Sequence, residues 1–211
     1  MIRTTKGKEM ISMMQTMTFL DAQLLLWIQQ NFRSDAATVF WEFMTDLGNM
    51  GFLWILITVG LLIRSKTRSI GLTAALSIVL NTVISNGILK LWVARPRPFS
   101  TFTEIIPLIT PPVDFSFPSG HTSSSFAVAF VLFALLPRRW GVGALVTAAL
   151  ISLSRLYLGV HYPTDVLTGV LIGYGVAKMA VWAVKKWEAR RISAFSMAFC
   201  QTVLKKKGGA P

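Results

Sequence analysis

The chain has 211 residues, of which 53% are hydrophobic and 14% are charged. Soluble domains usually carry roughly a quarter charged residues, so this composition disfavours a soluble protein and favours a membrane protein of one domain. The only cysteine is Cys200, which excludes a disulfide framework, a zinc knuckle or a CxxC redox pair within the chain.

The net charge of +12 comes from basic clusters that lie between or beyond the apolar runs. These clusters are Arg3/Lys6/Lys8, Arg64/Lys66/Arg68, Arg138/Arg139, Lys185/Lys186, Arg190/Arg191 and Lys205–Lys207. A nucleic-acid-binding protein would interleave basic residues with polar and aromatic ones on one face, so we expect no nucleic-acid partner. The pattern instead predicts cytoplasmic loops and attraction to anionic membrane lipids.

The first apolar stretch, residues 10–31, is a weak candidate for a membrane span because it contains Asp21, Gln23, Gln29 and Gln30. It either crosses the bilayer or lies as an amphipathic helix in the interface, and the sequence leaves both alternatives open. Five later stretches are clearer candidates for spans, which take roughly 20 helical residues. They run near 50–64, 70–93, 120–137, 140–158 and 164–184.

These stretches predict an all-α, polytopic membrane bundle of about six helices. We expect residues 1–187 to form the transmembrane domain and residues 188–211 to form a basic cytoplasmic tail. If the spans alternate, the basic residues of 64–68 and 138–139 share one side with the tail, and the positive-inside rule makes that side cytoplasmic. Both termini lie inside if residues 10–31 cross. The proline-rich loop 94–118 and the turn 158–163 then lie outside.

Ionisable side chains gather at the outer ends of three predicted spans, where such residues are costly and point to function. They are Lys90 and Arg97 after the third span, His121 at the start of the fourth, and Arg155, His161 and Asp165 around the turn between the last two. Both histidines of the chain are in this set. Each residue taken alone has a structural explanation, such as a snorkelling cation or a helix-terminal carboxylate. Their coincidence on one face predicts a site.

The cations suit a phosphate group, because guanidinium forks match phosphate oxygens and an ammonium adds a point charge. The segment Pro118-Ser119-Gly120-His121 precedes an apolar helix, so its free N–H groups would face an anion. Gly120 permits close approach of the backbone to a ligand. Ser119 is either a phosphate contact or a simple helix cap.

His161 and Asp165 have i,i+4 spacing, which places both side chains on one helix face. A carboxylate bonded to one ring nitrogen would leave the other nitrogen free to attack phosphorus. His121, on another helix, would protonate the leaving oxygen as a general acid. The outer loop holds only Glu104 and Asp114 as further acids, so we expect neither a metal nor another cofactor.

Three motifs in this order resemble those of a known family. Lys90 to Arg97-Pro98 resembles KxxxxxxRP, residues 118–121 resemble PSGH, and Ser154-Arg155 to His161 and Asp165 resembles SRxxxxxHxxxD. These are the motifs of the type 2 phosphatidic acid phosphatase superfamily, which also includes vanadium haloperoxidases and bacterial acid phosphatases. The hydrophobic spans exclude the soluble members.

The resemblance implies a helical core shared with vanadium haloperoxidases and a site on the extracytoplasmic face of a bacterial cytoplasmic membrane. It implies His161 as nucleophile, Asp165 as its partner and His121 as acid. Phosphate would be bound by Lys90, Arg97, Ser119, Gly120 and Arg155.

The small six-span form is similar to bacterial undecaprenyl pyrophosphate and phosphatidylglycerophosphate phosphatases. The leading hypothesis is therefore hydrolysis of a lipid phosphate monoester or pyrophosphate through a phosphohistidine. A phosphotransferase that passes the group to a lipid acceptor is the alternative, and a non-catalytic lipid-binding or lipid-moving protein is a lesser one. The sequence leaves the physiological lipid and the oligomeric state open.

Overall fold

The computed structural model describes the backbone of residues 2–207 and the side chains of residues 15–191. Within this range the chain is mostly helical and contains no strand, which confirms the all-α prediction. The elements in chain order are α1 (Ile2–Phe32), α2 (Asp35–Gly48), η1 (Asn49–Gly51), α3 (Phe52–Ile63), α4 (Arg68–Asn81), η2 (Thr82–Leu89), α5 (Lys90–Val93), α6 (Pro98–Thr101), α7 (Gly120–Leu135), α8 (Arg138–Tyr157) and α9 (Pro163–Lys207).

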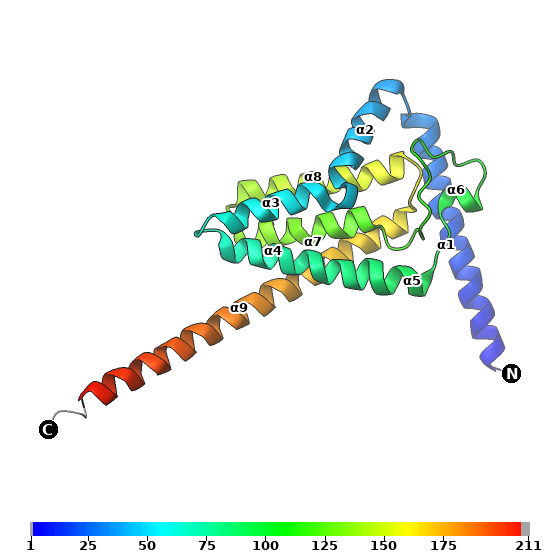
Figure 1. The fold of residues 1–211 in the computed structure, drawn as a ribbon. Helices are drawn as coiled ribbons and strands as arrows, with labels where there is room; N and C mark the ends of the chain where they lie inside the picture. Colours follow the sequence, from blue (N-terminus) through cyan, green and yellow to red (C-terminus); the bar gives the residue numbers. More distant parts are fainter. Residues whose placement is uncertain (1, 208–211) are drawn as a thin grey trace.

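Helices α3, α4, α7, α8 and the first half of α9 run side by side as a bundle, with α7 at its centre (Figure 1). Apolar residues of α7 are almost completely buried, among them Val128 and Val131. They pack against Trp54 of α3 and Ile151 of α8. The Trp54 indole N–H donates to Ser125 Oγ at 2.8 Å, so the polar atom of this buried ring has a partner inside the bundle.

The outer surface of the bundle is apolar, as expected for helices in contact with lipid. Large side chains such as Leu56, Val79 and Leu171 are exposed on it. Within the described residues, four helical segments are long and apolar enough to span a membrane: Asp35–Ile63, Arg68–Thr101, Arg138–Tyr157 and Pro163–Arg191. The central helix α7 has 16 residues, or about 24 Å at 1.5 Å per residue, and is shorter than a typical hydrocarbon core of about 30 Å. The prediction of a polytopic membrane bundle is confirmed.

The predicted span 70–93 is not a uniform α-helix. Its second half, η2, is a π-helix of 8 residues that ends immediately before Lys90. Each wider turn changes the face on which the following residues lie, and such segments are frequent at functional sites. Ala94 then adopts a left-handed conformation with φ of 48°, which ends α5 and turns the chain toward the loop.

Helix α1 differs from the others because it crosses the end of the bundle steeply (Figure 1). Ala22 and Leu25 of α1 pack against Ile105 of the loop 94–118 and against Tyr162. Gln29 also holds the loop, since its side chain donates to Glu104 O and accepts from Ile106 N–H, both at 3.0 Å. This orientation favours the interfacial alternative for residues 10–31, while the number of spans and the side of each terminus stay predictions.

The last helix, α9, continues through the predicted boundary at residue 187 and ends at Lys207. The basic tail therefore begins inside a helix that leaves the bundle (Figure 1). Residues 208–211 of the predicted tail lie outside the described residues.

Candidate active site

Most of the predicted site residues meet in one cavity at the end of the bundle beside α1. The cavity has a volume of about 550 Å³. Its lining includes Lys90, Arg97, Gly120, His121, Arg155 and His161, which come from three separate segments of the chain. Both imidazoles therefore face the same space as the three cations, which is the arrangement that the motif spacing predicts.

His161 lies in the short turn between α8 and α9 and is 2% exposed. Gly159 shapes this turn with a φ of +72°, a conformation that side chains rarely adopt. The ring of His161 has two different neighbours. Its Nε2 lies 3.4 Å from Arg97 Nη1, and its Nδ1 lies 3.7 Å from Asp165 Oδ2. Because Arg97 lines the cavity, Nε2 is the ring nitrogen nearer to a bound anion.

Burial lowers the pKa of His161 from 6.5 to about 4. The Asp165 carboxylate opposes this effect, while the charges of Arg97 and Arg155 act in the same direction as burial. The imidazole is therefore neutral near pH 7, and a neutral ring has the free lone pair that a nucleophile needs.

His121 begins α7 and is held by the end of α2. Its Nε2 lies 3.0 Å from Asn49 Oδ1, and the Asn49 amide nitrogen donates to Asp46 Oδ1 at 2.9 Å. Since the Asn49 oxygen can only accept, His121 Nε2 carries a hydrogen. A Cβ at Gly48 would lie 2.8 Å from His121 Cδ2, so a glycine is required for this close packing. Sequence reasoning missed Asn49 and Asp46, because no local pattern links them to His121.

The cations differ in how far their hydrogen-bonding capacity is used. Arg97 is 4% exposed, and its Nη1 donates to Val160 O at 2.8 Å. Arg155 donates to Thr45 Oγ1 through Nη1, but its buried Nε has no protein partner. A buried donor without a partner is costly. An anion in the cavity would complete the contacts of Arg155.

The comparisons with known proteins agree with this geometry. Residues 70–189 match the profile of the PAP2 superfamily, which is more than half of the chain. The chain belongs to the PAP2 superfamily.

Relatives and solved structures place the PAP2 chain among membrane phosphatases. It is 35% identical over 130 residues to an undecaprenyl-diphosphatase of Sulfolobus acidocaldarius, an alignment that covers 62% of this chain and 63% of that protein. The fold resembles the crystal structure of Aquifex aeolicus LpxE with a TM-score of 0.67 and 31% identity, over 75% of this chain and 93% of that one. It also resembles a transmembrane PAP2-type phosphatidylglycerolphosphate phosphatase of Bacillus subtilis, with a TM-score of 0.63, 26% identity and coverage of 84% and 87%.

Two residues of the predicted PAP2 site lie behind the cavity surface. Asp165 is fully buried, and its Oδ2 accepts from Ser116 Oγ at 2.5 Å and from Tyr162 N–H at 3.0 Å. Ser119 is also fully buried, and its hydroxyl oxygen accepts from Thr122 as the N-cap of α7. The cap alternative for Ser119 is therefore the one that the structure shows, while a phosphate contact from it stays a prediction. Gly120 lines the cavity and starts the helix.

Asp114 of the loop 94–118 contacts two of the three cations that are predicted to bind phosphate. Its carboxylate contacts both Lys90 Nζ and Arg97 Nη2, and its carbonyl oxygen accepts from Arg97 Nε at 2.8 Å. Burial would raise the pKa of Asp114, but hydrogen bonds from Lys90 and Arg97 lower it to about 2. In the sequence Asp114 stands out only as a possible metal ligand, and no local pattern predicts this contact.

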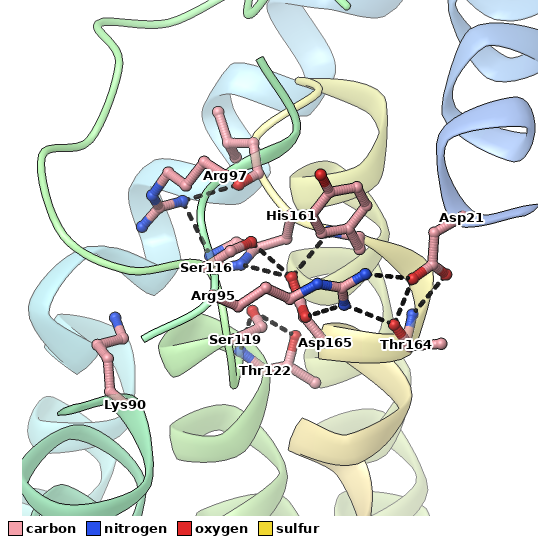
Figure 2. A network of polar contacts seen from close by, with 12 residues as sticks. Asp21, Lys90, Arg95, Arg97, Ser116, Ser119, Thr122, His161, Thr164 and Asp165 are labelled. Carbon is pink, nitrogen blue, oxygen red and sulfur yellow. Dashed lines mark hydrogen bonds and ion pairs between the residues drawn. The ribbon is translucent and has the colours of Figure 1, made fainter. Parts of the chain in front are cut away.

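Arg95 is a further residue that the motifs do not include, although it stands two positions before Arg97. It bridges Asp165 and Asp21 on the side of the network next to α1 (Figure 2). Its Cζ also lies 3.8 Å from the centre of the Tyr162 ring, a cation–π contact. Among the described residues, no three His, Cys, Asp or Glu side chains lie close enough to hold a metal ion, and the metal-free reaction stays a prediction.

Proposed function

We propose that this multi-pass membrane protein is a lipid phosphatase that hydrolyses a phosphate monoester or pyrophosphate through a phosphohistidine intermediate. The observation that supports it most is the single cavity lined by two imidazoles and three cations. Electrostatic stabilisation and positioning supply most of the catalysis in phosphoryl transfer, and this cavity offers both. The chain aligns with only 63% of the length of the Sulfolobus acidocaldarius relative, so the activity is proposed from the site of this chain itself.

In the proposed reaction, Lys90, Arg97 and Arg155 bind the phosphate oxygens after Asp114 has moved aside. The Gly120 end of α7 adds N–H groups and the positive end of a helix dipole. His161 Nε2 attacks phosphorus and a P–N bond forms while the bond to the leaving oxygen breaks. Arg97, beside Nε2, places the phosphorus next to the attacking nitrogen.

His121 donates a proton in the first step and accepts one in the second. Its Nε2–H is held by Asn49, so Nδ1–H is the group that donates to the leaving oxygen. The neutral ring then accepts a proton at Nδ1 from water, whose oxygen attacks the phosphohistidine. The P–N bond breaks, inorganic phosphate leaves, and both histidines return to their starting states.

A second cavity of about 610 Å³ supports a lipid substrate, because it shares Lys90, Gly120 and His121 with the catalytic one. It continues between α3 and α4 past Trp54, Ile55 and Ile78. A headgroup phosphate in the site would thus leave an apolar tail among apolar side chains. Undecaprenyl pyrophosphate and phosphatidylglycerophosphate are the candidate substrates, and the extracytoplasmic face of the membrane is the proposed location of the site.

The test is a phosphate-release panel with purified protein in detergent. We expect release from one or both candidate lipids, and loss of at least about 1,000-fold in His161→Ala, because the covalent route is then absent. Substantial activity in His161→Ala would rule out this nucleophile. Measuring phosphorylated lipid beside free phosphate separates hydrolysis from phosphotransfer, and wild-type protein that binds lipid phosphate without turnover would favour the non-catalytic alternative.

A further inference from the structure

Arg95 holds the carboxylate behind the proposed nucleophile. Its Nη1 donates to Asp165 Oδ1 at 2.7 Å and to Thr164 Oγ1 at 2.8 Å, while its Nη2 donates to Asp21 Oδ2 at 2.8 Å (Figure 2). Arg95 lines a different cavity from the one that holds the three phosphate-binding cations. It is therefore not placed to bind the phosphate itself.

Asp21 is the partner that fixes Arg95 from the far side. It is 5% exposed although α1 is largely exposed around it. Its Oδ1 accepts from Thr164 N–H at 3.1 Å and its Oδ2 accepts from Thr164 Oγ1 at 2.5 Å, so it also satisfies the start of α9. A buried carboxylate is costly unless it is paired and hydrogen-bonded, and Asp21 meets both conditions.

The two carboxylate oxygens of Asp165 have different partners, and this difference matters for His161. Arg95 occupies Oδ1, while Oδ2 accepts from Ser116 Oγ and Tyr162 N–H and is also the oxygen that faces the imidazole, at 3.7 Å. His161 Nδ1 is buried and makes no hydrogen bond in this structure. A shift of about 0.8 Å would bring the pair to a normal N–H···O distance of about 2.9 Å. The carboxylate would then select the tautomer with Nδ1–H, whose Nε2 lone pair points at the cavity.

We propose that Arg95 and Asp21 are positioning residues that keep Asp165 ionised and oriented toward His161 Nδ1. This inference rests on the proposed function, since it assigns them to the same reaction. It also explains why α1, the weakest span of the sequence, packs on the catalytic end of the bundle. A purely structural role, as a link between α1 and α9, is the competing explanation.

Kinetics separate the two explanations. Loss of a hydrogen-bonded partner behind a functional histidine typically costs about 10–100-fold in activity. We expect Arg95→Gln to lower kcat by that factor and to leave the inhibition constant of inorganic phosphate within about threefold, because the cavity cations are unchanged. Arg95→Lys should restore part of kcat. Asp21→Asn should lower kcat in the wild-type protein but have little further effect in Arg95→Gln, because the two residues act as a unit.

The matched control is Gln23→Ala, which removes a polar group from an exposed position of the same helix and should leave kcat unchanged. A structural defect would weaken phosphate inhibition together with kcat, and that result would overturn the inference. An unchanged kcat in Arg95→Gln would overturn it as well.

A second readout does not depend on turnover. The chain has 2 histidines, so ring ¹⁵N shifts of the labelled protein can be assigned with His121→Ala. We expect His161 to be the Nδ1–H tautomer in the wild-type protein and a mixture of tautomers in Arg95→Gln. If the two proteins differ in this way but the wild-type protein releases no phosphate, the proposed function is contradicted and the positioning role is still supported. Identical tautomers in both proteins would contradict the positioning role.

Discussion

Asp114 should compete with the substrate for two of the three cations, and replacing it with asparagine should strengthen phosphate binding. Its carboxylate lies between Lys90 and Arg97, and its pKa of about 2 keeps it ionised at any assay pH above 4. A phosphate must therefore displace an anion before it reaches these side chains. Asp114→Asn keeps the size of the side chain and its carbonyl acceptor but removes the charge.

The size of the effect follows from the exposure of the group. The Asp114 side chain is 50% exposed, so solvent screens its ion pairs, and exposed pairs are worth about 0–1 kcal/mol. Arg97 is almost fully buried, and hydrogen bonds to charged groups are worth about 1.5–3 kcal/mol. An intermediate cost of about 1–2 kcal/mol for displacing Asp114 corresponds to about 5–30-fold in affinity.

The assay is competitive inhibition of lipid-phosphate hydrolysis by inorganic phosphate. We expect the inhibition constant and KM to fall about 5–30-fold in Asp114→Asn, with little change in kcat, because the chemistry uses the two histidines. Glu104→Gln is the matched control, since Glu104 is an exposed acid of the same loop. An unchanged or weaker inhibition constant in Asp114→Asn would refute the competition. An equal gain in Glu104→Gln would show that only the net charge of the loop matters.

Three further predictions concern the histidines. Because burial holds the pKa of His161 at about 4, activity should rise as pH increases through 4. It should fall again as His121 loses its proton, and because burial and the charge of Arg155 lower the pKa of His121 well below 6.5, this fall should begin on the acid side of neutrality. A flat kcat/KM profile from pH 4 to 9 would contradict this division of roles. In the unfolded chain His161 has its ordinary pKa of 6.5, so between pH 4 and 6.5 the unfolded chain binds one proton more than the folded chain. About 3 kcal/mol of stability should therefore be lost as pH falls through that window, and thermal unfolding in detergent measures this loss. Asn49→Ala should lower kcat about 10-fold for a lipid phosphate, because Asn49 orients His121, but should barely affect p-nitrophenyl phosphate, whose leaving group needs no acid. An equal loss with both substrates would show that Asn49 does not act by orienting the general acid.

The clustering of the site could be predicted from sequence because its residues stand at the ends of apolar runs. Lys90, His121 and His161 each follow or begin a stretch that had to be a helix in lipid, and alternation of those helices brings such ends to one face. The motif spacing then fixed which side chains meet. The fold class follows from the same apolar runs, since helices satisfy their own backbone in a membrane.

The contacts that organise the site could not be predicted in the same way. Asn49 meets His121 across 72 positions, and Asp21 meets Arg95 across 74. No periodic pattern relates residues on such separate elements. The π-helix before Lys90 could not be recognised either, because a single glycine, Gly87, does not distinguish it from an α-helix. These features depend on packing between helices rather than on the sequence of any one of them.

The orientation of α1 connects the site to the membrane surface. As a span, α1 would have to place Asp21 within a lipid-facing helix, where an ionised carboxylate is expensive. As a helix across the end of the bundle, it buries Asp21 against Arg95 and Thr164 and leaves Phe19, Leu20 and Trp27 exposed. Exposed apolar and aromatic side chains beside a polar network are typical of a helix at the lipid–water interface. Two of the four polar residues that make residues 10–31 a weak span are thus used at this end of the bundle, because Asp21 holds Arg95 and Gln29 holds the loop that carries Asp114.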